Sequence, residues 1–350
     1  MTVIALFGGP SDERHVSVAT AQNVARTLTD ALCWFWTPGG AIHDVNPAEL
    51  VAHPRPFEND FEPSRPAIWP DLEQALDTLP VEDPVFFLAL HGGPGEDGTV
   101  QRMMERRGIP FTGSDSEASA SAFDKGLAKA MAAKSGKVKV AESRTVMESD
   151  EPKIRDAAKS MLTVHERIVL KPLAAGSSRG LFFLDRAGDL ERVVREIVSL
   201  QLPYIIEQFI HGRELTCGVI DTANGPVALP VVEIEVDPGF TFDYVGKYLG
   251  KGTREICPAK LPDDVTTAVQ QTALESHRAL HCAGYSRTDI MASKDGPYFL
   301  ELNTLPGLTV SSLVPQELKA AGIEFRDFLA MQLELARKRD INPAARSVAG

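Results

Sequence analysis

Cysteine is scarce in this chain of 350 residues. The four cysteines, Cys33, Cys217, Cys257 and Cys282, lie far apart and form no CxxC pair. Disulfide frameworks and structural zinc sites use cysteines in paired, closely spaced arrangements. The sequence therefore predicts reduced, buried thiols in a cytoplasmic protein rather than disulfides or zinc.

Long apolar runs are also absent. No run reaches the roughly 20 residues that a membrane-spanning helix needs. The first residues, "MTVIALFGG", are apolar but lack the basic segment and cleavage site of a signal peptide. They predict a buried first strand, and we expect no association with a membrane.

Basic residues are outnumbered by acidic ones. Lysine and arginine total 36 against 48 aspartates and glutamates, which gives a net charge of −12. Binding along nucleic acid or an anionic membrane needs a basic surface, so we expect neither partner. A small local basic pocket stays open. With 43% hydrophobic and 24% charged residues the chain is an ordinary globular protein, and its length predicts two or three separate cores.

Two apolar runs that end in glycine turns mark the first part of the chain. "VIALFGG" (3–9) and "PVFFLAL" (84–90) read as buried strands, and "HGGPGEDG" follows the second. With helices at 17–28 and 99–108 and a short strand "IPFTG", the alternation predicts an α/β domain over residues 1–112. Residues 51–70 hold five prolines and predict an irregular surface insertion without a core element.

After residue 112 the pattern changes. A helix that ends on Gly136, a helix near 151–162, a hairpin of "RIVLKP" and "LFFL", a helix at 187–200 and the strand "YIIEQFI" predict a second domain over 113–210. A third, over 211–340, has two strands, a long loop, a helix at 263–282, the strands "SRTDIMA" and "PYFLELN", and a helix at 325–338. We expect residues 341–350 to be a loose tail.

Oxygen ligands gather near the end of the third region. In "FLELNTLPGLTVSSL", Glu301 and Asn303 are two positions apart and so share one face of a strand. Asp289 lies in the preceding strand, and pairing of the two strands as a hairpin would bring the three together. Two carboxylates and an amide oxygen suit Mg²⁺, although a solvated polar face is the simpler alternative.

Cations that could bind phosphate precede this region. Lys171 ends an apolar strand beside the glycine-serine turn 174–180, and Lys125 is a second candidate. The turn does not match the P-loop pattern, so a P-loop fold is not expected. Glu207 and Glu214, in "IIEQFIHGRE", could accept hydrogen bonds from adenine or ribose. Each residue alone is more often an ordinary surface charge.

An ordered set of segments gives these residues a context. The segments are "LFGGPSDERHVS", "ALHGGPGEDGTVQ", "DK" at 124–125, "VLKPLAAGSS", "EQFIHGRELT", "DYVGKY", "CPAKL", "RTDI" and "ELNTLPGLTVSSLVP". In content and order the chain resembles the D-alanine–D-alanine ligases of the ATP-grasp superfamily. The resemblance covers nearly all of the chain except the proline-rich stretch and the tail. It implies a three-domain ATP-grasp fold with an N-terminal α/β preATP-grasp domain.

The resemblance also implies an activity: ATP-dependent joining of two D-alanine molecules through an acyl phosphate, for peptidoglycan synthesis, in a cytoplasmic homodimer. It implies that two Mg²⁺ ions, or Mn²⁺, are held by Asp289, Glu301 and Asn303. The implied ATP-binding residues are Lys125, Lys171, Ser178, Glu207 and Glu214.

The remaining implied roles concern the amino acids. Those that bind them are Glu13, His91, Lys247, Ser312 and Leu313. Those with a catalytic role are Glu13, Ser177, Tyr248, Arg287 and Gly307, the last two as oxyanion donors. We expect the loop around 242–256 to close over the reactive acyl phosphate, and Tyr248 favours an amide product by analogy.

Three departures from the family pattern concern the amino acid substrates. His15 stands where a glutamate is usual, Pro10 replaces a polar or basic residue, and the turn Ala174–Gly180 loses a charged pair and gains Arg179. Two alternatives therefore stay open. One is an ATP-grasp carboxylate–amine ligase or cyclase that acts on a different amino acid in specialised metabolism. The other is a nucleotide-binding protein without catalysis.

Overall fold

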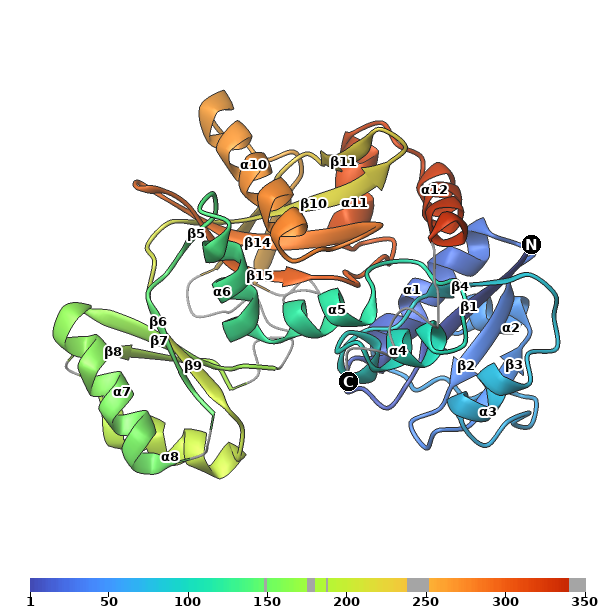
Figure 1. Cartoon of the computed structure of the whole chain (residues 1–350), viewed down its shortest axis with the longest axis horizontal. Helices are drawn as coiled ribbons and strands as arrows, with labels where there is room; N and C mark the ends of the chain where they lie inside the picture. Colours follow the sequence, from blue (N-terminus) through green and yellow to red (C-terminus); the bar gives the residue numbers. More distant parts are fainter. Residues whose placement is uncertain (148–149, 175–179, 187, 238–251, 340–350) are drawn as a thin grey trace.

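The computed structural model describes residues 1–147, 150–174, 180–186, 188–237 and 252–339. These residues form three sheets, each with its own helices, in three lobes (Figure 1). Among them, no helix is both long and apolar enough to cross a membrane. The mixed α/β class expected from the sequence is confirmed.

The first sheet has the strand order β3-β2-β1-β4. Its strands are β1 (Thr2–Gly8), β2 (Leu32–Trp36), β3 (Ile42–Val45) and β4 (Pro84–Leu88). β1 pairs in parallel with β2 and β4, whereas β3 pairs antiparallel. Because parallel strands are buried on both faces, they are continuously apolar. The connecting helices are α1 (Arg14–Thr27), α2 (Pro47–Ala52), α3 (Leu72–Asp77) and α4 (Thr99–Glu105).

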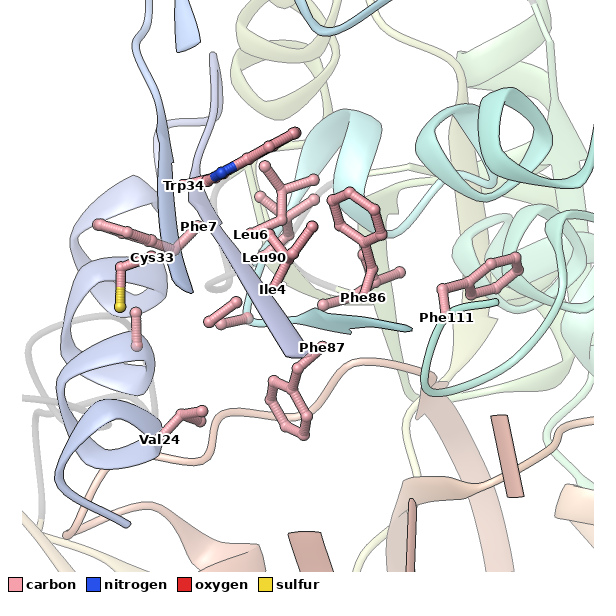
Figure 2. Close-up of a cluster of buried hydrophobic side chains, with 14 of the residues drawn as sticks. Ile4, Leu6, Phe7, Val24, Cys33, Trp34, Phe86, Phe87, Leu90 and Phe111 are labelled. Carbon is pink, nitrogen blue, oxygen red and sulfur yellow. The ribbon is translucent and has the colours of Figure 1, made fainter. Parts of the chain in front are cut away.

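Alternate residues of this sheet fill two layers of core. Phe7, Cys33 and Phe87 lie on the side of α1, and Leu6 and Phe86 lie on the other side (Figure 2). This core also receives apolar residues of α12 (Phe325–Lys338), which contacts both α1 and β4. The bounds of α12 match those expected from the sequence.

Two expectations for this region are wrong. Residues 109–113 form no regular strand, because only Phe111 bridges to β4. The proline-rich stretch does contribute to the core: Phe61 is only 6% exposed and packs edge-on against Phe7 and Phe35. Strands β2 and β3, and helices α2 and α3, were not anticipated.

The second sheet is fully antiparallel, in the order β6-β9-β7-β8. Its strands are β6 (Ser143–Val146), β7 (Arg167–Pro172), β8 (Phe182–Asp185) and β9 (Tyr204–Gln208). Helices α7 (Glu151–Val164) and α8 (Leu190–Leu200) cover one face, where Ile168, Leu170 and Ile206 are buried (Figure 1). The expected hairpin of β7 and β8 is confirmed, and its other face carries Lys171 and Phe183.

The third sheet has seven strands. They are β5 (Lys139–Val140), β10 (Arg213–Thr222), β11 (Gly225–Ala228), β12 (Val232–Val236), β13 (Thr253–Ile256), β14 (Tyr285–Ser293) and β15 (Gly296–Asn303). Helices α5 (Ser116–Phe123), α6 (Lys125–Lys134) and α10 (Asp263–Ala279) pack against it, and α11 (Leu313–Ala320) contacts β10. Four strands precede α10 where two were expected, and residues 253–256, expected to belong to a closing loop, form β13.

Candidate active site

The hairpin of β14 and β15 brings the expected oxygen ligands together. Asp289 lies opposite Glu301 in the antiparallel register, and Arg287 lies opposite Asn303. The register shifts after Asp289, so that Ile290 faces Phe299 instead of Leu300. This irregularity turns Phe299 into the core while Glu301, two residues later, faces the site.

Arg287 and Asp289 form a buried bidentate pair. Nε of Arg287 donates to Oδ1 of Asp289 over 2.9 Å, and Nη2 donates to Oδ2 over 3.0 Å. Thr216, opposite Asp289 on β10, also donates to Oδ1, over 2.7 Å. These bonds fix the carboxylate and the guanidinium side by side on the same face of the sheet.

The donor set here suits a divalent cation. It consists of the carboxylates of Asp289 and Glu301 and the amide of Asn303. In the described ranges no group of three or more His, Cys, Asp or Glu side chains offers an alternative metal site. The buried Nδ2 of Asn303 has no hydrogen-bond partner in the same ranges, and a flip of the amide would put its oxygen there. A cavity of about 30 Å³ lies against Glu301, Asn303 and Lys125. Magnesium is commonly bound by one or two carboxylates with water and phosphate oxygens completing its shell.

Helix α6 and the second sheet each supply one lysine. Lys125, the first residue of α6, lies 3.3 Å from Oε2 of Glu301. Lys171 lies 2.8 Å from Oε2 of Glu207, on the sheet face that α7 and α8 leave open. Burial opposes the charge on Lys171, but Glu207 and Glu301 outweigh it and raise the pKa of this amine. Lys125 thus pairs with a carboxylate of the third sheet, and Lys171 pairs with a carboxylate of the second sheet.

Sequence reasoning missed several neighbours of these residues. Lys129 contacts Glu207, and its position one turn after Lys125 was the available signal. Phe183 and Phe209 lie with ring centroids 5.8 Å apart, under the guanidinium of Arg167. Their strand positions place both rings on the face of Glu207 and Lys171.

His91 and Glu96 form a second buried pair, at the end of β4. Nδ1 of His91 lies 3.0 Å from Oε1 of Glu96 and 2.9 Å from the carbonyl oxygen of Leu305, so this nitrogen carries a proton. Burial opposes both charges, but the attraction and hydrogen bond between the two groups outweigh it. The pKa of His91 is therefore raised and that of Glu96 is lowered. Gly92 (φ +67°) leaves room for Glu13, whose Oε2 would be 2.7 Å from an added Cβ. Glu13 therefore lies against Gly92, the residue after His91.

The turn after β15 is tied to α1. Asn23 donates to the carbonyl oxygen of Leu308 over 2.8 Å, and a Cβ at Gly307 would lie 2.9 Å from Oγ of Ser312. Leu313 begins α11, a helix that the sequence did not reveal. A helix N-terminus presents unpaired N–H groups that favour a carboxylate.

Of the other expected residues, Glu214 is in the described part of the chain and four are outside it. Glu214 lies on β10, on the same strand face as Thr216. Ser177, Ser178, Lys247 and Tyr248 fall in residues 175–179 and 238–251, outside the described part, as do Arg179 and most of the expected closing loop.

The departure at His15 has a structural counterpart in the proline-rich stretch. Nε2 of His15 lies 2.9 Å from Oδ1 of Asp60, and Nε of Arg14 donates to the same oxygen over 3.0 Å. The hydrogen bond from His15 contributes most to lowering the pKa of Asp60. A glutamate at position 15 would instead face Asp60 with like charge. Asp60 thus holds the first turn of α1, directly after Glu13.

This contact gives a testable prediction. We expect Asp60→Asn to raise KM for the first amino acid about 3-fold with little change in Tm, since exposed ion pairs contribute at most about 1 kcal/mol to stability. Asp44→Asn, which weakens the exposed Arg65–Asp44 pair, is the matched control. Steady-state kinetics with equal KM for both variants would contradict the prediction.

Comparisons with known proteins agree on one family. Residues 2–114 match the model "D-ala D-ala ligase N-terminus", and residues 134–334 match "D-ala D-ala ligase C-terminus". The D-alanine–D-alanine ligase of Methylacidiphilum infernorum is 34% identical over 96% of both chains, and that of Nitrosospira multiformis is 36% identical over 95% of this chain and 96% of its own.

Solved structures show the same relationship. The D-Ala:D-Ser ligase VanG from Enterococcus faecalis superposes with a TM-score of 0.79 at 27% identity, over 96% of this chain and 99% of its own. The D-alanine–D-alanine ligase of Bacillus anthracis gives a TM-score of 0.73 at 27% identity, over 96% and 97%. The chain belongs to the D-alanine–D-alanine ligase family and has its ATP-grasp fold.

Proposed function

We propose that the chain is a cytoplasmic, ATP-dependent ligase that joins two D-alanine molecules into D-alanyl-D-alanine for peptidoglycan synthesis. The observation that carries the proposal is the convergence of Arg287, Asp289, Glu301 and Asn303 on one sheet face, with Lys125 on Glu301. A carboxylate needs activation before an amine can displace its oxygen, and phosphoryl transfer from ATP supplies it.

ATP would lie between the second and third sheets. Lys125 and Lys171 would contact its phosphates, with Ser178 beside them. Phe183 and Phe209 offer aromatic faces for the adenine, and Glu214 would accept from the nucleoside. Asp289, Glu301 and Asn303 would hold two Mg²⁺ ions, or Mn²⁺, which when bound neutralise charge on the transferring phosphoryl group.

The amino acids would lie at the junction with the first sheet. Glu13 would bind the ammonium group of the first D-alanine, beside His91. Ser177, Lys247 and Tyr248 would complete this site. Ser312 and the N-terminus of α11 at Leu313 would receive the second carboxylate.

Ligation would then proceed on the acyl phosphate. The neutral amine of the second D-alanine forms a bond to the acyl carbon, and phosphate leaves. Arg287 and the N–H of Gly307 would stabilise the tetrahedral oxyanion, a contribution of roughly 3–4 kcal/mol per donor. Asp289 orients Arg287 for this task through its two hydrogen bonds.

We also propose the division of labour among the domains. Residues 1–112 would hold the first amino acid, 113–210 the nucleotide, and 211–340 the metal and oxyanion site, with 341–350 a tail. As in the family, we expect a homodimer, which light scattering after gel filtration would detect.

A second candidate is ligation of a different amino acid. The His15–Asp60 contact next to Glu13 and the likeness to a D-Ala:D-Ser ligase both favour testing it. ADP release should be measured with Mg²⁺, ATP and a panel of D- and L-amino acids, with products read by mass spectrometry. We expect turnover with D-alanine and the mass of the dipeptide. Turnover only with another amino acid would establish the second candidate.

A further inference from the structure

One buried carboxylate holds two lysines in the nucleotide site. Oε1 of Glu207 lies 2.8 Å from Nζ of Lys129, and Oε2 lies 2.8 Å from Nζ of Lys171. The three side chains come from α6, β9 and β7. Glu207 is 5% exposed, Lys129 is 3% exposed and Lys171 is 14% exposed. Only Lys171, the most exposed of the three, is accessible to a ligand.

The position of α6 explains why Lys129 is covered. This helix lies between the second and third sheets (Figure 1) and packs on β15. At its start the N–H of Lys125 donates to the carbonyl oxygen of Leu173, just after β7. Lys129 follows one turn later on the inner side of the helix. Its ammonium group therefore faces Glu207 and not the space where a ligand would enter.

Glu207 needs this second lysine whenever Lys171 leaves it. A buried carboxylate that loses its only counter-charge is strongly destabilising. If Lys171 were that only counter-charge, its movement toward a phosphate would strand Glu207. Burial lowers the pKa of Lys129, but Glu207 acts against that shift, and both lysines hold the pKa of Glu207 low. Lys129 and Glu207 thus remain an ion pair when Lys171 moves away.

We propose that Lys129 is a positioning residue. It keeps the charge of Glu207 neutralised, so that the ammonium group of Lys171 can move from Glu207 to the phosphates of a nucleoside triphosphate. The inference rests on the proposed nucleotide site. Glu207 then acts on the nucleotide through the two lysines. Lys129 touches no ligand at all, and its effect must vanish when Glu207 carries no charge.

Binding of ADP and of adenosine, measured by calorimetry, tests this. We expect Lys129→Met to weaken ADP binding about 10-fold, which is about 1.4 kcal/mol, and to leave adenosine binding unchanged because adenosine has no phosphate. Lys134→Met, an exposed position at the end of the same helix, is the matched control. Equal weakening of ADP and adenosine would overturn the proposal, since that is the result of a general disturbance of α6.

The Glu207→Gln background makes the test independent of how well Lys129→Met folds. With an amide at position 207, the added change of Lys129 to Met should alter ADP affinity less than about 2-fold, because no charge is left to neutralise. A loss of 10-fold in this background would show direct contact with the nucleotide and would overturn the proposal. Failure of the wild-type chain to join D-alanine would sink the proposed ligation but leave this binding cycle readable.

Discussion

Replacement of Glu301 by glutamine is expected to lower kcat for ADP release about 1,000-fold, which corresponds to roughly 4 kcal/mol of lost transition-state stabilisation. Glutamine keeps the shape of the side chain but removes its negative charge. That charge is one of two carboxylates on the site face of the β14–β15 hairpin, and it pairs with Lys125. In this variant the proposed metal ions lose one of their charged ligands, and Lys125 loses its ion pair with Glu301.

Two further measurements separate this explanation from a folding defect. The Mg²⁺ concentration for half-maximal activity should rise in Glu301→Gln, while circular dichroism stays that of the wild type. Asp295→Asn changes another carboxylate of the same hairpin, at its exposed turn, and should retain wild-type turnover. If Glu301→Gln turned over at the wild-type rate, the charge of Glu301 would have no part in catalysis and the proposed metal site would be wrong.

The hairpin shows what could be predicted from the sequence. Asp289, Glu301 and Asn303 were expected on one face because strand side chains alternate, and the register confirms this grouping. The irregularity after Asp289 was not expected. Local alternation alone would put Phe299 on the same face as Glu301, and only the pairing with β14 turns it into the core. A register shift depends on how two strands pair, which the pattern of one strand does not reveal.

Other features escaped because they depend on contacts between distant segments. The proline-rich stretch has no periodic pattern, yet Phe61 packs in the first core and Asp60 reaches Arg14 and His15. Lys129 looked like an ordinary helix lysine, since its partner Glu207 lies 78 positions later in the chain. Motifs identified the residues that we propose to touch ligands, whereas the residues that position these side chains needed coordinates.

Glu317 is a buried acid that no motif suggested. It lies on α11, is 0% exposed, and its Oε1 accepts the N–H of Gly218 over 2.8 Å. A Cβ at Gly218 would lie 2.5 Å from Oε2, so glycine is needed there, and Oε2 has no hydrogen-bond partner in the described ranges. Burial raises the pKa of Glu317 to about 8, although the Gly218 N–H and Arg287 oppose this. At neutral pH the group is therefore mostly an uncharged acid.

We expect Glu317→Gln to stabilise the protein increasingly as pH rises. The unfolded chain releases this proton near the ordinary pKa of 4.5, whereas the folded chain keeps it up to about 8. The unfolded state thus binds fewer protons between these values, and wild-type stability falls with rising pH across that window. The full loss is on the order of 5 kcal/mol above pH 8. Glutamine keeps the bond to Gly218 and cannot ionise, so the variant avoids the loss.

Urea unfolding of both chains at pH 5, 7 and 9 measures the effect. Near pH 5 the wild type and Glu317→Gln should have nearly equal free energies of unfolding, because both side chains are neutral in the folded state there. The difference should grow toward pH 9 by several kcal/mol. Glu82→Gln, at an exposed loop position, should show no such growth. A constant difference between wild type and Glu317→Gln at all three pH values would mean that Glu317 is already charged in the folded protein. Its unpartnered oxygen would then need a cation close to Gly218, and Arg287, which lies opposite Gly218 in the strand register, is the group that could provide it.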